Sequence, residues 1–169
     1  MSKLRKYLAR YLMKLKARLV VRRLNDSLNF PVDAHAVRKV LVILPRNLNL
    51  LDRATHFIQS LRKTYPGWEI ELFDVDKLSE SQLTRLHLPQ PEVLERLRYA
   101  GYHFVLDLND RFDDLSSFIA LMTEAPYRLH LHSEDSLYHN MTYHAKTVNG
   151  ELYYEPLLSY LRQLFVKEA

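Results

Sequence analysis

The sequence predicts one α/β domain with a mostly parallel sheet, preceded by a basic amphipathic helix. A chain of 169 residues, 47% of them hydrophobic, is long and apolar enough for a well-packed core. Continuous apolar runs such as KVLVILP and HFVLDL are typical of strands buried on both faces. Segments with helical spacing of apolar residues separate these runs, and such alternation builds a parallel sheet between two helical layers. We therefore expect a three-layer body.

Residues 1–24 form the predicted basic helix. Nine of the 24 Lys and Arg residues, and none of the 20 acidic residues, lie in this segment. The basic residues are Lys3, Arg5, Lys6, Arg10, Lys14, Lys16, Arg18, Arg22 and Arg23. Ser2 is placed to cap the helix. Apolar residues recur at the spacing of an amphipathic helix. The predicted apolar stripe consists of Leu4, Tyr7, Leu8, Tyr11, Leu12, Leu15, Leu19 and Val20.

Three interpretations of this helix stay open. It could lie on an anionic membrane, where each Lys or Arg near the surface contributes ~1 kcal/mol. It could bind a partner protein or nucleic acid, or it could pack on its own domain with a solvated basic face. Nucleic acid is the least expected partner, because Tyr7 and Tyr11 belong to the apolar stripe and leave the basic face without stacking residues. No apolar run reaches the ~18 residues of a spanning helix, and the chain has no cysteine. We expect a cytoplasmic protein, attached at most to the inner face of a membrane.

Residues 25–36 are predicted as a linker and residues 37–169 as the α/β domain. The domain begins with a strand at KVLVILP, and Asn47 or Asn49 can cap the helix that follows. Pro66 and Gly67 end that helix. The residues predicted for its inner face are Leu50, Ala54, Phe57, Ile58 and Leu61.

The remaining segments continue the alternation of strands and helices. WEIELFDVD predicts a strand, SESQLTRL a short helix, and LHLP a short strand or loop. PEVLERLRYAG predicts a helix that begins at Pro91 and ends before Gly101. HFVLDL and YRLHLH predict strands on either side of a helix in DDLSSFIALMTEAP. TVNGELYY predicts a hairpin at Asn149-Gly150, and PLLSYLRQLF a final helix. The inward residues predicted for these two helices are Leu115, Phe118, Ile119, Met122, Leu158, Leu161 and Phe165.

The order of several short motifs resembles a known family. The first helix ends in SLRKTYP, a later strand ends in Asp107-Leu108, and a helix closed by Ala125-Pro126 precedes Arg128 and another strand. This order is similar to the N-terminal acceptor domain of bacterial heptosyltransferases, the lipopolysaccharide glycosyltransferases of family 9 with the two-domain GT-B fold. The resemblance spans residues 37–165 and implies a Rossmann-like domain.

The sequence departs from this family at two places. The family's first loop carries a glycine-aspartate pair whose aspartate is implied to be the general base. Counting back from Pro66, the pair falls on Asn49-Leu50, and Asp52 lies two residues further, a rotation of ~200° on a helix. The family also continues into a second domain that binds the nucleotide sugar, whereas this sequence ends at Ala169.

These departures set the functional expectation. We expect a non-catalytic pseudoenzyme, derived from a glycosyltransferase, that serves as a scaffold or accessory subunit in a membrane-associated protein assembly. The alternative is the acceptor-binding half of a split heptosyltransferase-like enzyme in cell-envelope polysaccharide synthesis. The basic helix would be the element that attaches to the membrane or to a partner.

A candidate ligand site lies where the parallel strands end, because open α/β sheets bind ligands beyond their carboxyl edges. The residues predicted there are Arg46, Asn47, Asn49, Asp107 and Asn109. Arg46 could bind an anion at the start of a helix, although Asn and Asp in such loops also serve as turn and cap residues. With only three glycines, the chain has no glycine-rich phosphate loop. We expect no cofactor, and we assign no catalytic residue.

Four histidines gather in RLHLHSEDSLYHNMTYH, namely His130, His132, His139 and His144. His130 and His132 are two residues apart on a predicted strand and therefore share one face. Two histidines and a carboxylate can bind a divalent metal, but the segment has no compact ligand motif. We expect no metal and interpret the histidines as surface or hydrogen-bonded groups. The Tyr-rich stretches YHNMTYH and ELYYEP could form a protein interface.

Overall fold

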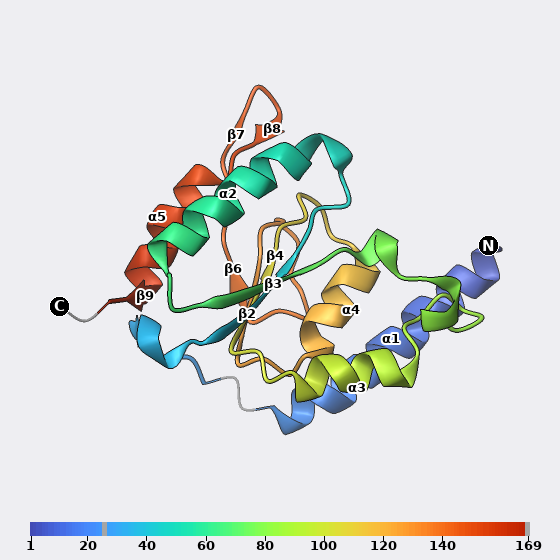
Figure 1. Ribbon diagram of the computed structural model, residues 1–169. Coiled ribbons are helices and arrows are strands. Elements are labelled where there is room, and N and C mark those ends of the chain that lie inside the picture. Colours follow the sequence, from blue (N-terminus) through green and yellow to red (C-terminus); the bar gives the residue numbers. More distant parts are fainter. Residues whose placement is uncertain (25–26, 168–169) are drawn as a thin grey trace.

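A five-stranded parallel sheet lies at the centre of the protein, which is described here by a computed structural model of residues 1–24 and 27–167 (Figure 1). The strands follow the order β3-β2-β4-β5-β6. Their bounds are β2 (Lys39–Ile43), β3 (Glu69–Phe73), β4 (Phe104–Asp107), β5 (Tyr127–His130) and β6 (Met141–Thr142). The predicted α/β class, the parallel sheet and the Rossmann-like architecture are confirmed.

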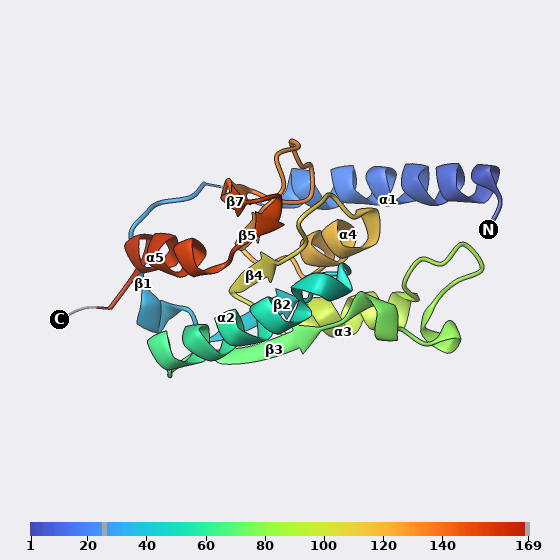
Figure 2. The same ribbon diagram turned by 90° about the horizontal axis from the view of Figure 1, so that it is seen from above.

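Two helical layers enclose this sheet. Helices α2 and α5 cover one face, and α3 and α4 cover the other. Their bounds are α2 (Leu51–Thr64), α3 (Pro91–Tyr99), α4 (Asp114–Met122) and α5 (Glu155–Leu164). Helix α1 (Lys3–Arg23) lies alongside α4, on the side away from the sheet (Figure 2). The N-terminal helix therefore adds a layer outside the three-layer body.

Strand β2 is apolar throughout because both of its faces are buried. Val40 and Val42 pack toward α2 and α5, whereas Leu41 and Ile43 pack toward α3 and α4. All four side chains are buried, as expected for a strand covered on both faces. The chain passes from β2 to β3 on one side and returns to β4 on the other. In doubly wound sheets, ligands bind at the carboxyl edge between two such strands.

Helix α2 buries the face that the sequence predicts. Its four predicted inner residues, and Leu50 just before it, are all buried. The Asn47 side chain accepts a hydrogen bond from the Asn49 N–H at 3.1 Å. This bond caps a 3-10 turn, η2 (Leu48–Leu50), that leads into the helix. The predicted cap is therefore present, one turn earlier than α2 itself.

Other predicted elements are present with shifted bounds. SESQLTRL contains only the 3-10 turn η4 (Glu80–Gln82), and a further turn, η3 (Val75–Lys77), follows β3. The hairpin consists of β7 (Thr147–Val148) and β8 (Glu151–Leu152), joined by Asn149 and Gly150 at φ 53° and 76°. Positive φ at both central residues is what a two-residue type I′ turn requires. Of the predicted inward residues of α4 and α5, Leu115 and Leu158 are only half-buried, and the others are buried.

The predicted linker is partly structured. Residues 25 and 26 lie outside the described residues, but β1 (Val32–Asp33) and the 3-10 turn η1 (Ala34–Ala36) fall within the range 25–36. β1 pairs in parallel with β9 (Phe165–Val166), which directly follows α5. Pairing of residues more than 130 positions apart joins the beginning of the body to its end.

Helix α1 packs through a different face from the predicted stripe. Its buried residues are Ala9, Met13, Ala17 and Val20. The last three belong to one apolar cluster with residues of α4 and Tyr138. Of the predicted stripe only Val20 is buried, and the other seven residues are exposed. The helix therefore packs on its own domain, as one of the three interpretations expects, but through a face other than the predicted apolar stripe. Small side chains allow two helix backbones to approach closely, whereas leucines would hold them apart.

Two ion pairs fix the direction of α1 along α4. Arg10 contacts Asp114 at 2.6 Å, at the start of α4. Arg23 contacts Glu124, just after the end of α4. The two helices therefore run in the same direction. The Ser2 hydroxyl accepts a hydrogen bond from the Arg5 N–H at 3.3 Å, which confirms Ser2 as the N-cap.

Replacing Ala17 by leucine should loosen this packing. Ala17 has no exposed surface, and extra methylene groups in a packed interior cost about 1–3 kcal/mol. We expect the free energy of unfolding, measured with urea, to fall by that amount. Leu19→Ala on the exposed face is the matched control and should change it by less than ~0.5 kcal/mol. Equal effects of the two changes would mean that α1 does not pack through Ala17.

Candidate functional site

Arg46 follows β2 and lies at the carboxyl edge of the sheet. Its guanidinium contacts Asp76 at 2.6 Å and Asp113 at 2.9 Å. The hydrogen bond to Asp76, helped by the charge of Asp113, raises the pKa of Arg46 against the opposing effect of burial. The cation that we predicted to bind an anion is therefore already paired with two carboxylates. An incoming anion would have to displace at least one of them.

The other predicted ligand residues occupy two environments. The Arg46 N–H donates to Asn109 Oδ1 at 2.9 Å, and Asn109 donates to Asp107 Oδ1 through its side-chain amide at 2.8 Å and its backbone N–H at 3.1 Å. Asn47 and Asn49 are exposed, and Asn47 donates to Asp110. The structure thus links Arg46, Asn109 and Asp107 in one chain of hydrogen bonds and leaves both asparagines on the rim.

Three buried histidines lie beside Asp107 at the same edge. The histidine cluster comprises His130, at the end of β5, His132, two residues later, and His139, just before β6. The ring centroids of His130 and His132 are 3.7 Å apart, and those of His130 and His139 are 4.7 Å apart. We interpreted these histidines as surface or hydrogen-bonded groups. His130 and His139 are buried and hydrogen-bonded, to Thr142 and Ser136, His132 is buried, and only His144 of the four is exposed.

Burial keeps two of these rings neutral. It lowers the pKa of His130 to about 3, with a further contribution from the neighbouring His139 and His132. Burial, and then His139, also lowers the pKa of His132. Burial alone would raise the pKa of Asp107, but His139 and Asn109 hold it below its usual value. The edge therefore combines neutral imidazoles with one buried carboxylate.

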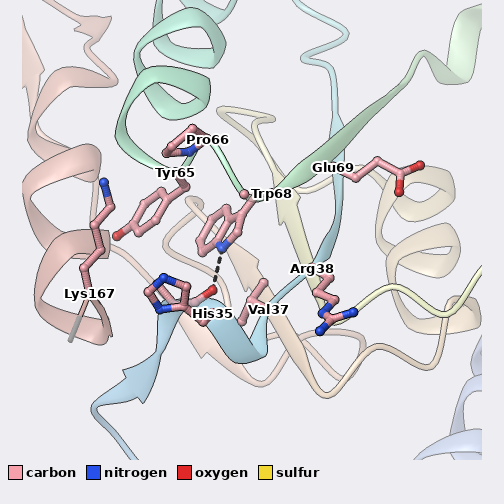
Figure 3. A pocket seen from close by; sticks show the side chains of 10 residues that line it. His35, Val37, Arg38, Tyr65, Pro66, Trp68, Glu69 and Lys167 are labelled. Carbon is pink, nitrogen blue, oxygen red and sulfur yellow. Dashed lines mark hydrogen bonds between the residues drawn. The ribbon is translucent and has the colours of Figure 1, made fainter.

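A separate pocket lies at the opposite, amino edge of the sheet (Figure 3). It has a volume of about 610 Å³ and contains the stacked rings of Tyr65 and Trp68, whose centroids are 3.9 Å apart. The Trp68 indole donates to the Ala34 carbonyl at 2.9 Å, and the Tyr65 hydroxyl donates to the Phe165 carbonyl at 2.8 Å. Because both polar groups already bond the backbone of other segments, we interpret this pocket as a structural feature.

The outer surface of α1 carries a second candidate site. The outer stripe is the exposed apolar face of this helix, and its side chains are accessible by up to 76% at Leu4. It consists of Leu4, Tyr7, Leu8, Tyr11, Leu12, Leu15 and Leu19. All nine predicted basic residues are also exposed. Within residues 1–24 and 27–167, only Arg10 and Arg23 of these nine form ion pairs.

An apolar groove lies beside the outer stripe. Leu12, Leu15 and Leu19 line one side of it, and the segment that leads into α3 lines the other. The groove has a volume of about 320 Å³. The groove therefore adjoins the outer stripe through these three leucines. From sequence, this part of α1 is recognisable only as one side of an amphipathic pattern.

Sequence reasoning missed features that depend on the fold. Ala9, Met13 and Ala17 recur every four residues, which was the available signal for the packed face of α1. The pairing of Arg46 with Asp76 and Asp113 joins residues of three loops, and no pattern in the local sequence indicates it.

Comparison of the chain with protein-family models, with curated proteins and with solved structures found no match. Among the described residues, no helix combines the length and apolarity needed to cross a membrane.

Proposed function

We propose that this chain is a non-catalytic accessory protein that docks on an anionic membrane surface through the outer stripe of α1. The observation that carries this proposal is the arrangement of three faces on one helix. The buried face holds α1 on α4. Successive residues of a helix lie about 100° apart, so the outer stripe lies opposite that face. Basic residues lie along both borders, for example Lys3 and Lys14 on one side and Lys16 on the other, and Arg18 and Arg22 lie within the stripe itself.

A lipid surface matches this arrangement in both charge and polarity. A helix with an apolar face and many Lys and Arg residues lies in the headgroup region with its leucines and aromatic residues inserted. The 21 residues of α1 extend ~32 Å, and a membrane supplies acyl chains and anionic headgroups along this whole length. A protein partner would need an apolar groove with acidic borders of the same extent. Charge complementarity therefore favours the membrane.

The body supports an accessory role rather than catalysis. Asp52, the acid nearest to the family's expected base, is exposed in the first turn of α2. The Arg46 side chain is occupied by carboxylates. A scaffold derived from a glycosyltransferase is consistent with the motif order and with the Rossmann-like fold. In this proposal, α1 attaches the chain and the body offers a surface to other members of an assembly.

Vesicle co-sedimentation tests the membrane proposal. The intact protein should sediment with vesicles of phosphatidylcholine that contain phosphatidylserine, and not with phosphatidylcholine alone. Raising the salt concentration should weaken binding, because the headgroup attraction is screened. Lys14→Gln should weaken it roughly fivefold, the equivalent of ~1 kcal/mol for a basic residue near the surface. Lys63→Gln, on exposed α2, is the matched control and should bind like the unchanged protein.

Substitutions in the outer stripe distinguish the contribution of apolar insertion to vesicle binding from the contribution of charge attraction. Leu4→Ser combined with Leu8→Ser leaves the charge unchanged and should weaken vesicle binding, since apolar insertion contributes with buried area. Sedimentation independent of phosphatidylserine, or unaffected by both sets of changes, would contradict the proposal. Binding to a protein or RNA without vesicle binding would do so too. Thermal stabilisation by a nucleotide sugar or sugar acceptor would instead favour the split-enzyme alternative.

A further inference from the structure

The histidine cluster contains buried polar atoms that bond nothing else in the described chain. Both ring nitrogens of His132, Nδ1 of His130 and Nε2 of His139 have no hydrogen-bond partner. Oδ2 of Asp107 is likewise unbonded, and it lies 3.3 Å from His139 Nε2 without the alignment of a hydrogen bond. Buried polar atoms are normally hydrogen-bonded, so a concentration of such atoms at one place marks a candidate site for a bound ion.

The remaining atoms of the same side chains are held in place. His130 Nε2 lies 2.8 Å from the Thr142 hydroxyl, and His139 Nδ1 lies 2.7 Å from the Ser136 hydroxyl. Asp107 Oδ1 accepts two hydrogen bonds from Asn109. In three of the four side chains, one polar atom is therefore oriented by an outer partner and the other is left free. Metal-binding histidines and carboxylates show this division between ligand atom and outer hydrogen bond.

We propose that the three histidines of this cluster bind a zinc ion, with Asp107 as the fourth ligand. One candidate atom from each histidine lies within 4.8 Å of those of the other two. Bonds of about 2.0 Å in a tetrahedral site place ligand atoms ~3.3 Å apart, so the rings need only small movements.

The ligand set indicates a structural site rather than a catalytic one. The four side chains are nearly inaccessible, and four protein ligands would leave no coordination position for water or substrate. Imidazole with one carboxylate suits zinc better than calcium or magnesium, which prefer oxygen ligands. The ion would join the ends of β4 and β5 to the segment that leads into β6. This proposal replaces the expectation from sequence that the chain binds no metal.

Zinc titration of the intact, tag-free protein tests the proposal. After dialysis against a chelator, the protein should bind one equivalent of Zn²⁺ in competition with a chromogenic chelator, and its melting temperature should rise. Co²⁺ should give the intense visible absorption of a tetrahedral complex. No binding of zinc, or a Co²⁺ complex without the intense absorption of a tetrahedral site, would overturn it.

Variants locate the site. His132→Ala should weaken zinc binding at least ~100-fold, and Thr142→Val, which removes only an outer hydrogen bond, about 10-fold. Thr142→Ser keeps the hydroxyl and should restore the affinity of the unchanged protein. His144→Ala and His56→Ala, on exposed histidines, are matched controls and should bind normally. If His132→Ala does not fold, Thr142→Val against Thr142→Ser decides. Unchanged affinity in Thr142→Val, or loss in His144→Ala, would overturn the assignment.

Discussion

Replacing Arg128 by leucine is expected to lower the free energy of unfolding by about 2–6 kcal/mol, because it leaves two carbonyls without their donors at a cost of about 1–3 kcal/mol each. Its side chain is 1% exposed. Nη1 donates to the Ala125 carbonyl at 2.7 Å, and Nε donates to the Tyr138 carbonyl at 3.1 Å. Leucine would leave both carbonyls buried without these donors, and hydrogen bonds to charged groups contribute more than neutral ones. Urea unfolding followed by circular dichroism measures the change.

Two further variants test the physical reason. Arg128→Lys keeps the charge but lacks the planar fork that reaches two acceptors, so its stability should fall between those of the unchanged protein and Arg128→Leu. Arg111→Leu, at an exposed position, should change the free energy of unfolding by less than ~0.5 kcal/mol. If Arg128→Leu and Arg111→Leu were equally stable, the buried hydrogen bonds of Arg128 would contribute nothing to folding.

Replacing Trp68 by alanine is expected to cost about 3–5 kcal/mol of unfolding free energy. The indole stacks on Tyr65 and meets Phe104 and Phe165 edge-on, with centroids 6.1 and 5.5 Å away. It therefore joins the end of α2 and strand β4 to β9. Removing the ring leaves a cavity among aromatic side chains that belong to three segments and cannot collapse together. Chemical denaturation of both proteins at the same temperature gives the difference.

Trp68→Phe separates packing from hydrogen bonding. Phenylalanine retains most of the ring contacts but cannot donate to the Ala34 carbonyl, a bond worth ~1 kcal/mol. Its cost should therefore be well below that of Trp68→Ala. A loss under ~1 kcal/mol in Trp68→Ala would show that this aromatic group is not a central part of the core.

Local sequence patterns predict an element correctly where its packing follows one strong periodicity of apolar residues. The inner face of α2, from Leu50 to Leu61, was predicted residue by residue. Helix α1 shows the limit of the same method, because it has two apolar faces. Leucine and tyrosine make the outer stripe more hydrophobic, but Ala17 and its small neighbours suit close contact with another helix. Hydrophobicity alone ranks these two faces in the wrong order.

The candidate sites show what sequence distance conceals. His130 and His132 were expected to share a face because they are two residues apart on a strand. Asp107 and His139 join them only because β4 and β5 are neighbours in register and the chain returns to the same edge. The sequence around each residue does not indicate that Asp107 and His139 lie beside His130 and His132. The β1–β9 pair was missed for the same reason, since two-residue strands have no periodicity to detect.

The shared direction of α1 and α4 has a consequence for how the carboxyl edge meets its surroundings. Helix α1 runs along the strands rather than across them (Figures 1 and 2). With α1 flat on a bilayer, the strands lie parallel to the lipid plane, and the edge that holds Arg46 opens sideways instead of toward the bulk. A molecule confined to the lipid surface would then reach this edge by lateral diffusion, which is a two-dimensional search. The same edges of neighbouring copies would be able to face one another within the plane of the membrane.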